Sequence, residues 1–329
     1  MIRYFNTGYI SRYLVVFAIA ILLWLPSILY PSPYVGTETY AFNFLTYLSI
    51  SNPLLFTVIS MILTLITAVM LNLYSIKFNL SGKVNTLVWA LYILISSAVV
   101  GGFHNNPITI TNIIMVFVWM NLMNLPQSTN KIITIYNSSF LIGLAALLFP
   151  VLIFLVLLVW LTIFVHRVMN LRFLVVSLVG IATPFFFIMV WFFFTGNLHE
   201  QLFNLISYFK ISTEIPIFDN VLNITSIAII TILTLMSVFG VLAMLSEQNI
   251  NTRRNLLIVV LFFVINTAIL VVFNTNIEFL LTLLIPIVLL ITYWLNQVRR
   301  PKVYNIILTI LLLLILVNQY YTRLPNFIP

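Results

Sequence analysis

The chain has 329 residues, of which 63% are hydrophobic and only 6% are charged, and its mean hydropathy is +1.18. Because water-soluble domains carry about 25% charged residues, this composition excludes a soluble globular protein and predicts an all-α protein embedded in a membrane. The absence of cysteine excludes disulfides, thiolate metal sites and cysteine nucleophiles. The net charge of +8 comes from basic residues scattered between apolar runs, a pattern that does not indicate nucleic acid as a partner.

Apolar segments follow one another along the whole chain, and a membrane crossing needs roughly 20 apolar residues. Residues 137–165 form an apolar segment that is long for one span, with Pro150 near its middle. Because proline interrupts helical hydrogen bonding, this segment is compatible with one kinked helix, two short helices or a re-entrant pair. The clear spans are nine: 13–30, 53–74, 84–101, 108–124, 171–195, 224–246, 255–273, 278–295 and 303–320.

The distribution of basic residues distinguishes these alternatives. With the N-terminus in the cytoplasm, alternating loops place twelve basic residues inside and two outside, as the positive-inside rule requires. This holds only if both ends of 137–165 are cytoplasmic, because Lys131 precedes the segment and Arg167 follows it. We therefore predict two short membrane helices that meet near Phe149-Pro150. The predicted total is about eleven membrane helices in a bacterial inner membrane, with the C-terminus outside.

Acidic residues and histidines gather on the predicted outer face. His104 and His199 lie outside, whereas His166 lies at the inner rim beside Arg167. The long outer loop, residues 196–223, predicts a short amphipathic helix that lies in the membrane interface. One face of this helix would carry Leu202, Phe203, Leu205 and Ile206. Five of the six acids fall outside: Glu38, Glu200, Glu214, Asp219 and Glu278.

The first outer loop, residues 31–52, contains the stretch "TETYAFNFLTYLSIS". The helical spacing of Tyr40, Phe44 and Tyr47 predicts a short interfacial helix that begins just after Glu38. Thr37 or Thr39 would cap this helix, and a carboxylate near a helix N-terminus is favoured by the helix dipole. Glu38 thus has two interpretations, as part of a helix start or as the acid of a functional site.

The order of these features resembles the C-type (GT-C) glycosyltransferases. The likeness covers residues 1–200: an acid in the first outer loop, an interfacial helix, further spans, and paired short helices around "GLAALLFPVLIF". Residues 201–329 add the long outer loop and four C-terminal spans, without a soluble domain. The whole chain is also similar to an uncharacterised family of bacterial multi-pass inner-membrane proteins. The run "NSSFLIGLAALLFPVLIF…LRFLVVSLVGIATPF" carries that second likeness.

The GT-C resemblance implies a polyprenyl-phosphate-linked sugar as donor and Glu38 as general base or metal ligand. Such a transferase needs a base for the acceptor hydroxyl and cations for the donor phosphate. The phosphate-binding candidates are Lys210, His104 and His199. A bound divalent cation stays open, and no other cofactor is evident.

Two further functional classes stay open. One is a non-catalytic protein of envelope assembly that binds a membrane-protein partner or a membrane lipid. The other is a flippase or transporter of a lipid-linked substrate. Proton- or sodium-coupled transport is disfavoured, because every Asp, Glu, Lys and Arg falls at or beyond the end of a predicted span.

Overall fold

The computed structural model describes residues 5, 10–31, 40, 43–81, 86–99, 107–207, 209, 221–273, 277–298 and 301–321. All regular structure in these residues is helical. The N-terminal half contains α2 (Ile10–Leu29), α3 (Asn43–Ser51), α4 (Pro53–Lys77), α5 (Leu87–Val99), α6 (Ile108–Asn124), η1 (Leu125–Gln127), α7 (Lys131–Leu148), η2 (Pro150–Leu155) and α8 (Val156–Val165). The C-terminal half contains α9 (Leu171–Phe194), α10 (Leu198–Ser207), α11 (Val221–Met244), η3 (Leu245–Glu247), α12 (Ile250–Phe273), η4 (Ile277–Leu283), α13 (Leu284–Gln297) and α14 (Pro301–Tyr321).

The lengths of these helices fit a membrane. Nine helices of the described residues are long and apolar enough to cross one, and two shorter apolar helices cover Leu87–Ala98 and Pro150–Val165. A helix satisfies its backbone hydrogen bonds internally, which is what a segment in lipid requires. The fold therefore agrees with the predicted multi-pass membrane protein. The total number of crossings, the kind of membrane and the orientation of the termini stay predictions.

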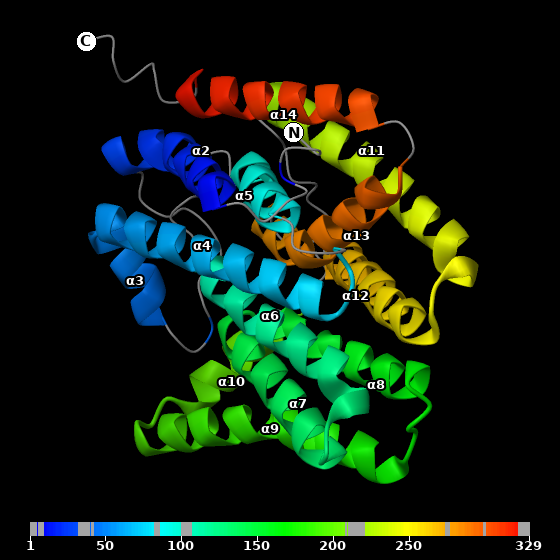
Figure 1. Ribbon diagram of the computed structural model, residues 1–329. Helices are drawn as coiled ribbons and strands as arrows, with labels where there is room; N and C mark the ends of the chain where they lie inside the picture. The colour runs from blue at the N-terminus through cyan, green and yellow to red at the C-terminus, as the bar shows by residue number, and fades with distance from the viewer. Residues whose placement is uncertain are drawn as a thin grey trace.

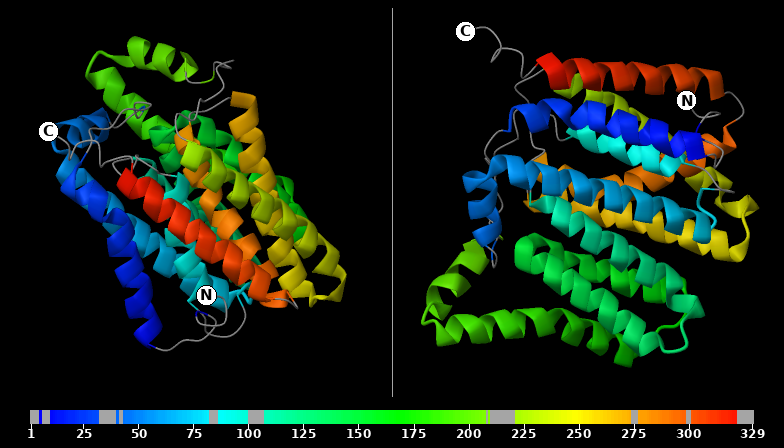
Figure 2. Two further views of the ribbon diagram at one scale, coloured as in Figure 1. Left: turned by 90° about the horizontal axis from the view of Figure 1, so that it is seen from above. Right: turned by 60° about the vertical axis from the view of Figure 1, so that its left-hand side comes forward.

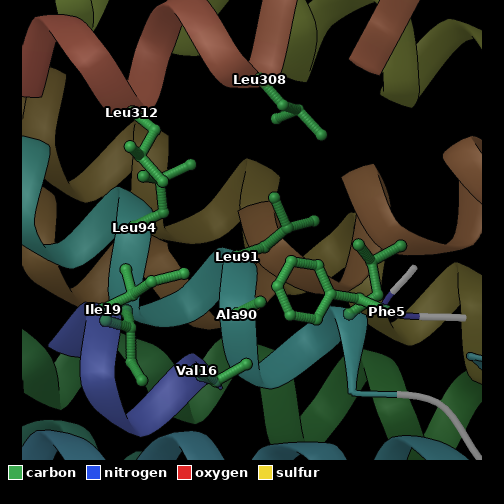
Figure 3. A pocket seen from close by; sticks show the side chains of 10 residues that line it. Phe5, Val16, Ile19, Ala90, Leu91, Leu94, Leu308 and Leu312 are labelled. Carbon is green, nitrogen blue, oxygen red and sulfur yellow. The ribbon is translucent and has the colours of Figure 1, made fainter. Parts of the chain in front are cut away.

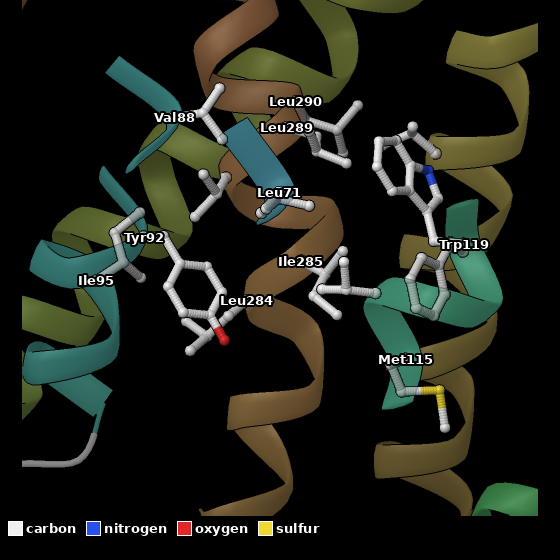
Figure 4. Close-up of a cluster of buried hydrophobic side chains, with 14 of the residues drawn as sticks. Leu71, Val88, Tyr92, Ile95, Met115, Trp119, Leu284, Ile285, Leu289 and Leu290 are labelled. Carbon is white, nitrogen blue, oxygen red and sulfur yellow. The ribbon is translucent and has the colours of Figure 1, made fainter. Parts of the chain in front are cut away.

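The long helices lie side by side with their axes roughly along one direction, so the bundle has two ends (Figure 1). At one end lie α3 and α10, and at the other lie the connections α6–α7, α8–α9 and α11–α12 (Figures 1 and 2). Helices of both halves share one hydrophobic core, in which α13 packs on α5 and α14 packs on α2. Figure 4 shows the centre of this core, where side chains of α4, α5, α6 and α13 meet.

The segment predicted to contain two helices is broken where the sequence predicts. Helix α7 ends at Leu148, and the 3-10 helix η2 begins at Pro150 and leads into α8. α7 starts at Lys131, six residues before the predicted start, because the side chain of Asn130 caps it by accepting a hydrogen bond from the N–H of Ile133. The chain returns along α7, and the charge of Lys131 acts on His166 just after α8. The two ends of the segment therefore lie toward the same end of the bundle, and their placement in the cytoplasm stays a prediction.

Two glycines allow α7 and α9 to approach closely. A Cβ atom at Gly143 would lie 2.8 Å from the carbonyl oxygen of Ile181, and one at Gly180 would lie 2.8 Å from the Cβ of Ser139. Small residues at such a crossing bring helix backbones together, and this packing is a main source of helix association in lipid. The crossing fixes α9, which is otherwise largely exposed, to the rest of the bundle.

Candidate functional site at the Tyr40 end

Tyr40 joins three parts of the chain at the end of the bundle where α3 and α10 lie, which we call the Tyr40 end. Its hydroxyl donates a hydrogen bond to the carbonyl oxygen of Gln201 in α10 at 3.1 Å. Its backbone N–H donates to the carbonyl oxygen of Leu148, the last residue of α7, also at 3.1 Å. Its ring packs edge-on against Phe192 of α9, with centroids 6.5 Å apart and planes at 79°. Tyr40 is thereby held against α7, α9 and α10.

Each contact of Tyr40 has a local cause. The carbonyl of Leu148 has no partner within α7 because it belongs to the last turn of that helix, so the N–H of Tyr40 supplies one. Tyr40 is buried, with 3% of its surface exposed, and burial raises the pKa of its phenol. The hydroxyl therefore stays protonated and acts as a hydrogen-bond donor.

Helix α3 begins later than the sequence predicts. Tyr40 forms a bend outside the helix, and α3 runs from Asn43 to Ser51. Thr37 and Thr39, one of which is expected to cap the interfacial helix, lie outside the described residues. The aromatic side chain at Tyr40 was predicted to lie on one face of that helix. It instead packs against other elements before the helix starts.

Of the four predicted site residues, the structure describes His199 alone. His199 lies in the first turn of α10, is exposed, and is two residues from Gln201, the partner of Tyr40. Glu38, His104 and Lys210 lie outside the described residues, as do Glu214 and Asp219. In the described part of the chain, no group of three His, Asp or Glu residues gathers to hold a metal ion. The predicted short helix of the long outer loop is present as α10, and Phe203 on its apolar face is 70% exposed.

A family described as "Family of unknown function (DUF6427)" matches residues 13–328. The chain belongs to the DUF6427 family. No curated protein and no solved structure matches it. The family match runs from α2 through α14, so the predicted likeness to an uncharacterised family is confirmed for nearly the whole chain.

Polar side chains also meet inside the bundle of this DUF6427 protein, where the sequence analysis did not expect them. The hydroxyl of Tyr92 in α5 lies beside Thr67 of α4 and Asn112 of α6, and all three residues are buried. The Tyr92 hydroxyl and the Asn112 Oδ1 do not reach hydrogen-bond geometry with a partner. Figure 4 shows Tyr92 pointing between the helices toward Leu284. These groups bring polar side chains of α4, α5 and α6 close together in the core.

Two further hollows within the bundle are mainly apolar. The cavity between α2, α5 and α14 has a volume of about 20 Å³ and is lined by side chains such as Val16, Leu91 and Leu312 (Figure 3). A water molecule in such a space would lack polar partners. A larger cavity of about 200 Å³ between α11, α12 and α13 is also mainly apolar, with Thr231, Thr234 and Thr267 in its wall. Each of these threonine hydroxyls bonds to a carbonyl of its own helix.

Proposed function

We propose that the protein is a GT-C-like glycosyltransferase that uses a polyprenyl-phosphate-linked sugar at the Tyr40 end, and that this end faces outward. The observation that carries the proposal is the anchoring of the first outer loop on α10 by Tyr40. Glu38 precedes Tyr40 by two residues, and two residues of chain span at most about 7 Å. His199 precedes Gln201 by two residues on the other side of the same hydrogen bond.

The bend at Tyr40 also favours a functional role for Glu38. The capping interpretation required a helix that begins directly after the "TET" stretch, and Tyr40, which follows that stretch, lies in a bend. A lone carboxylate in an outer loop, two residues from the hydrogen bond between Tyr40 and Gln201, is suited to act as a general base. The proposal therefore assigns proton transfer to Glu38 and leaves helix capping aside.

The reaction follows from these assignments. The Glu38 carboxylate accepts the proton of the acceptor hydroxyl, whose oxygen attacks the anomeric carbon of the donor sugar. The bond between that carbon and the phosphate oxygen breaks, and polyprenyl phosphate leaves with the bonding electrons. Lys210, His104 and His199 are assigned to the phosphate, where a positive charge or an N–H donor stabilises the negative charge of the leaving group. A divalent cation beside Glu38 would serve the same purpose.

The test compares Glu38→Gln with wild type in a strain of the source organism that lacks the gene. The measured quantities are the amount of protein in the membrane fraction and the profile of lipid-linked and envelope glycans. We expect normal accumulation with loss of one glycan species for Glu38→Gln. Glu247→Gln is the matched control, because Glu247 is an exposed acid at the opposite end of the bundle. Full rescue by Glu38→Gln would exclude catalysis by this residue and favour a non-catalytic assembly protein.

A second variant tests the anchoring itself. Tyr40→Phe removes the hydrogen bond to Gln201 and keeps the ring beside Phe192. We expect the glycan product to fall several-fold while the protein accumulates normally, since a neutral hydrogen bond contributes about 1 kcal/mol to stability. Unchanged product formation by Tyr40→Phe would mean that the position of the first loop does not matter for the activity.

A further inference from the structure

A basic hollow lies at the end of the bundle opposite to Tyr40. It has a volume of about 810 Å³ and lies between the end of α8 and the start of α12. Three arginines line it, Arg167 after α8 and both Arg253 and Arg254 near the start of α12. The remaining wall is apolar and consists of Phe164, Val165, Met169, Ile250 and Leu257. We call this set of residues the arginine hollow.

The backbone of Arg167 has a conformation that usually selects glycine. Its φ is +58°, in the left-handed region. The N–H of Arg167 bonds to the carbonyl of Phe164 and the N–H of Val168 bonds to that of Ile163, so α8 ends in a Schellman motif with Arg167 at the left-handed position. Helix α9 ends in the same way at Gly196, with φ of +77°. A side chain at this position has a steric cost that glycine avoids, so an arginine here points to a role for its guanidinium group.

The three arginines line the same hollow and have no acidic partner among the described residues. Within the part of the chain that the structure describes, no carboxylate forms an ion pair with Arg167, Arg253 or Arg254, and Glu247, the acid closest in sequence, is exposed and unpaired with them. Two of the three arginines lie at the N-terminus of α12, where the helix dipole also favours an anion. Arginines anywhere in the predicted cytoplasmic loops would satisfy the positive-inside rule. The rule therefore does not explain why these three arginines line one hollow.

We propose that the arginine hollow binds the phosphate of an anionic membrane phospholipid. The guanidinium groups would surround the phosphodiester, and the acyl chains would run along the apolar wall. Phe164 and Ile250 of this wall are 63% and 70% exposed, which places apolar surface directly beside the cationic groups. A soluble phosphate would need only the cationic groups, whereas a lipid uses both parts of the wall. Basic hollows between membrane helices commonly bind lipid headgroups in this way.

The test measures thermal unfolding of the full-length protein in neutral detergent with added phosphatidylglycerol, phosphatidylcholine or inorganic phosphate at equal concentrations. A ligand that binds the folded protein raises Tm in a concentration-dependent way. We expect phosphatidylglycerol to raise Tm more than the other two additions. Arg167→Gly should keep a basal Tm equal to or above that of wild type, because glycine fits the left-handed position. Its apparent affinity for phosphatidylglycerol should fall about five- to tenfold.

Asn79→Gly is the matched control, because Asn79 also has a positive φ, of 57°, and also ends its helix in a Schellman motif. This variant should keep the full response to phosphatidylglycerol. The double variant Arg253→Gln/Arg254→Gln should lose the response without any change at the end of α8. Equal responses of wild type to the two lipids, or an unchanged response in both arginine variants, would overturn the proposal. A response to inorganic phosphate as large as that to phosphatidylglycerol would overturn the assignment to a lipid.

Discussion

The crossing of α7 and α9 allows a sharp prediction about stability. Alanine at Gly143 would place Cβ 2.8 Å from the carbonyl oxygen of Ile181 and 2.9 Å from Cγ of Pro184. Ordinary contacts between such atoms are about 3.5–4.0 Å, so the two helices must separate by roughly 0.6 Å or more. Such overpacking costs about 1–3 kcal/mol, and the higher helix propensity of alanine offsets about 1 kcal/mol of this. We expect a net loss of about 1 kcal/mol for Gly143→Ala.

The partner glycine gives an internal check. A Cβ at Gly180 would meet Ser139 at 2.8 Å and the carbonyl oxygen of Tyr136 at 2.9 Å, so Gly180→Ala should destabilise by a similar amount. The double variant should lose less than the sum, because one separation of the helices accommodates both methyl groups. The assay is a titration with SDS in mixed micelles, followed by tryptophan fluorescence. A gain of about 1 kcal/mol for Gly143→Ala, the propensity effect alone, would refute the close approach.

Three further predictions concern the end with the arginine hollow. His166 is buried, and this burial, followed by the charges of Arg254 and Lys131, lowers its pKa to about 4 from a usual 6.5. As pH falls below about 6.5 the unfolded chain binds a proton that the folded chain does not, so stability should decrease until about pH 4. The free energy of unfolding should fall by at most about 3 kcal/mol, and solvent screening reduces this value. The decrease should be absent in His166→Phe. Asn170→Ala removes the side-chain cap on the N–H of Arg172 and should cost about 1 kcal/mol in an SDS titration. Lys131→Cys, in a chain without other cysteines, should be labelled only from the cytoplasmic side, and labelling from outside would contradict the predicted orientation.

Much of the helical layout could be predicted from the sequence, because each crossing is a continuous apolar run with its own internal hydrogen bonds. The break at Phe149-Pro150 is the clearest case. Proline predicted an interruption there, and the basic residues at both ends predicted that the chain returns to the same side. The structure contains the interruption, and the return to the cytoplasmic side stays a prediction.

The contacts that define the two candidate sites could not be predicted in this way. Tyr40 bonds to Gln201 across 161 positions, and no local pattern indicates such a pairing. The spacing of Tyr40 with Phe44 suggested one helical face, but tertiary contacts hold Tyr40 in a bend before α3 begins. The left-handed backbone of Arg167 was also hidden, because the turn after α8 contains no glycine to indicate it.

The hydrogen bond between Tyr40 and Leu148 has a consequence for how the protein is made. About a hundred residues separate the two partners, so synthesis at roughly 5–20 residues per second produces Leu148 roughly 5–20 s after Tyr40. During that interval the first loop has neither the end of α7 nor α10 to bind. A newly made chain therefore inserts several helices before this loop can reach its final position. Completion of the Tyr40 end is a late event of biogenesis, and it depends on the arrival of α10.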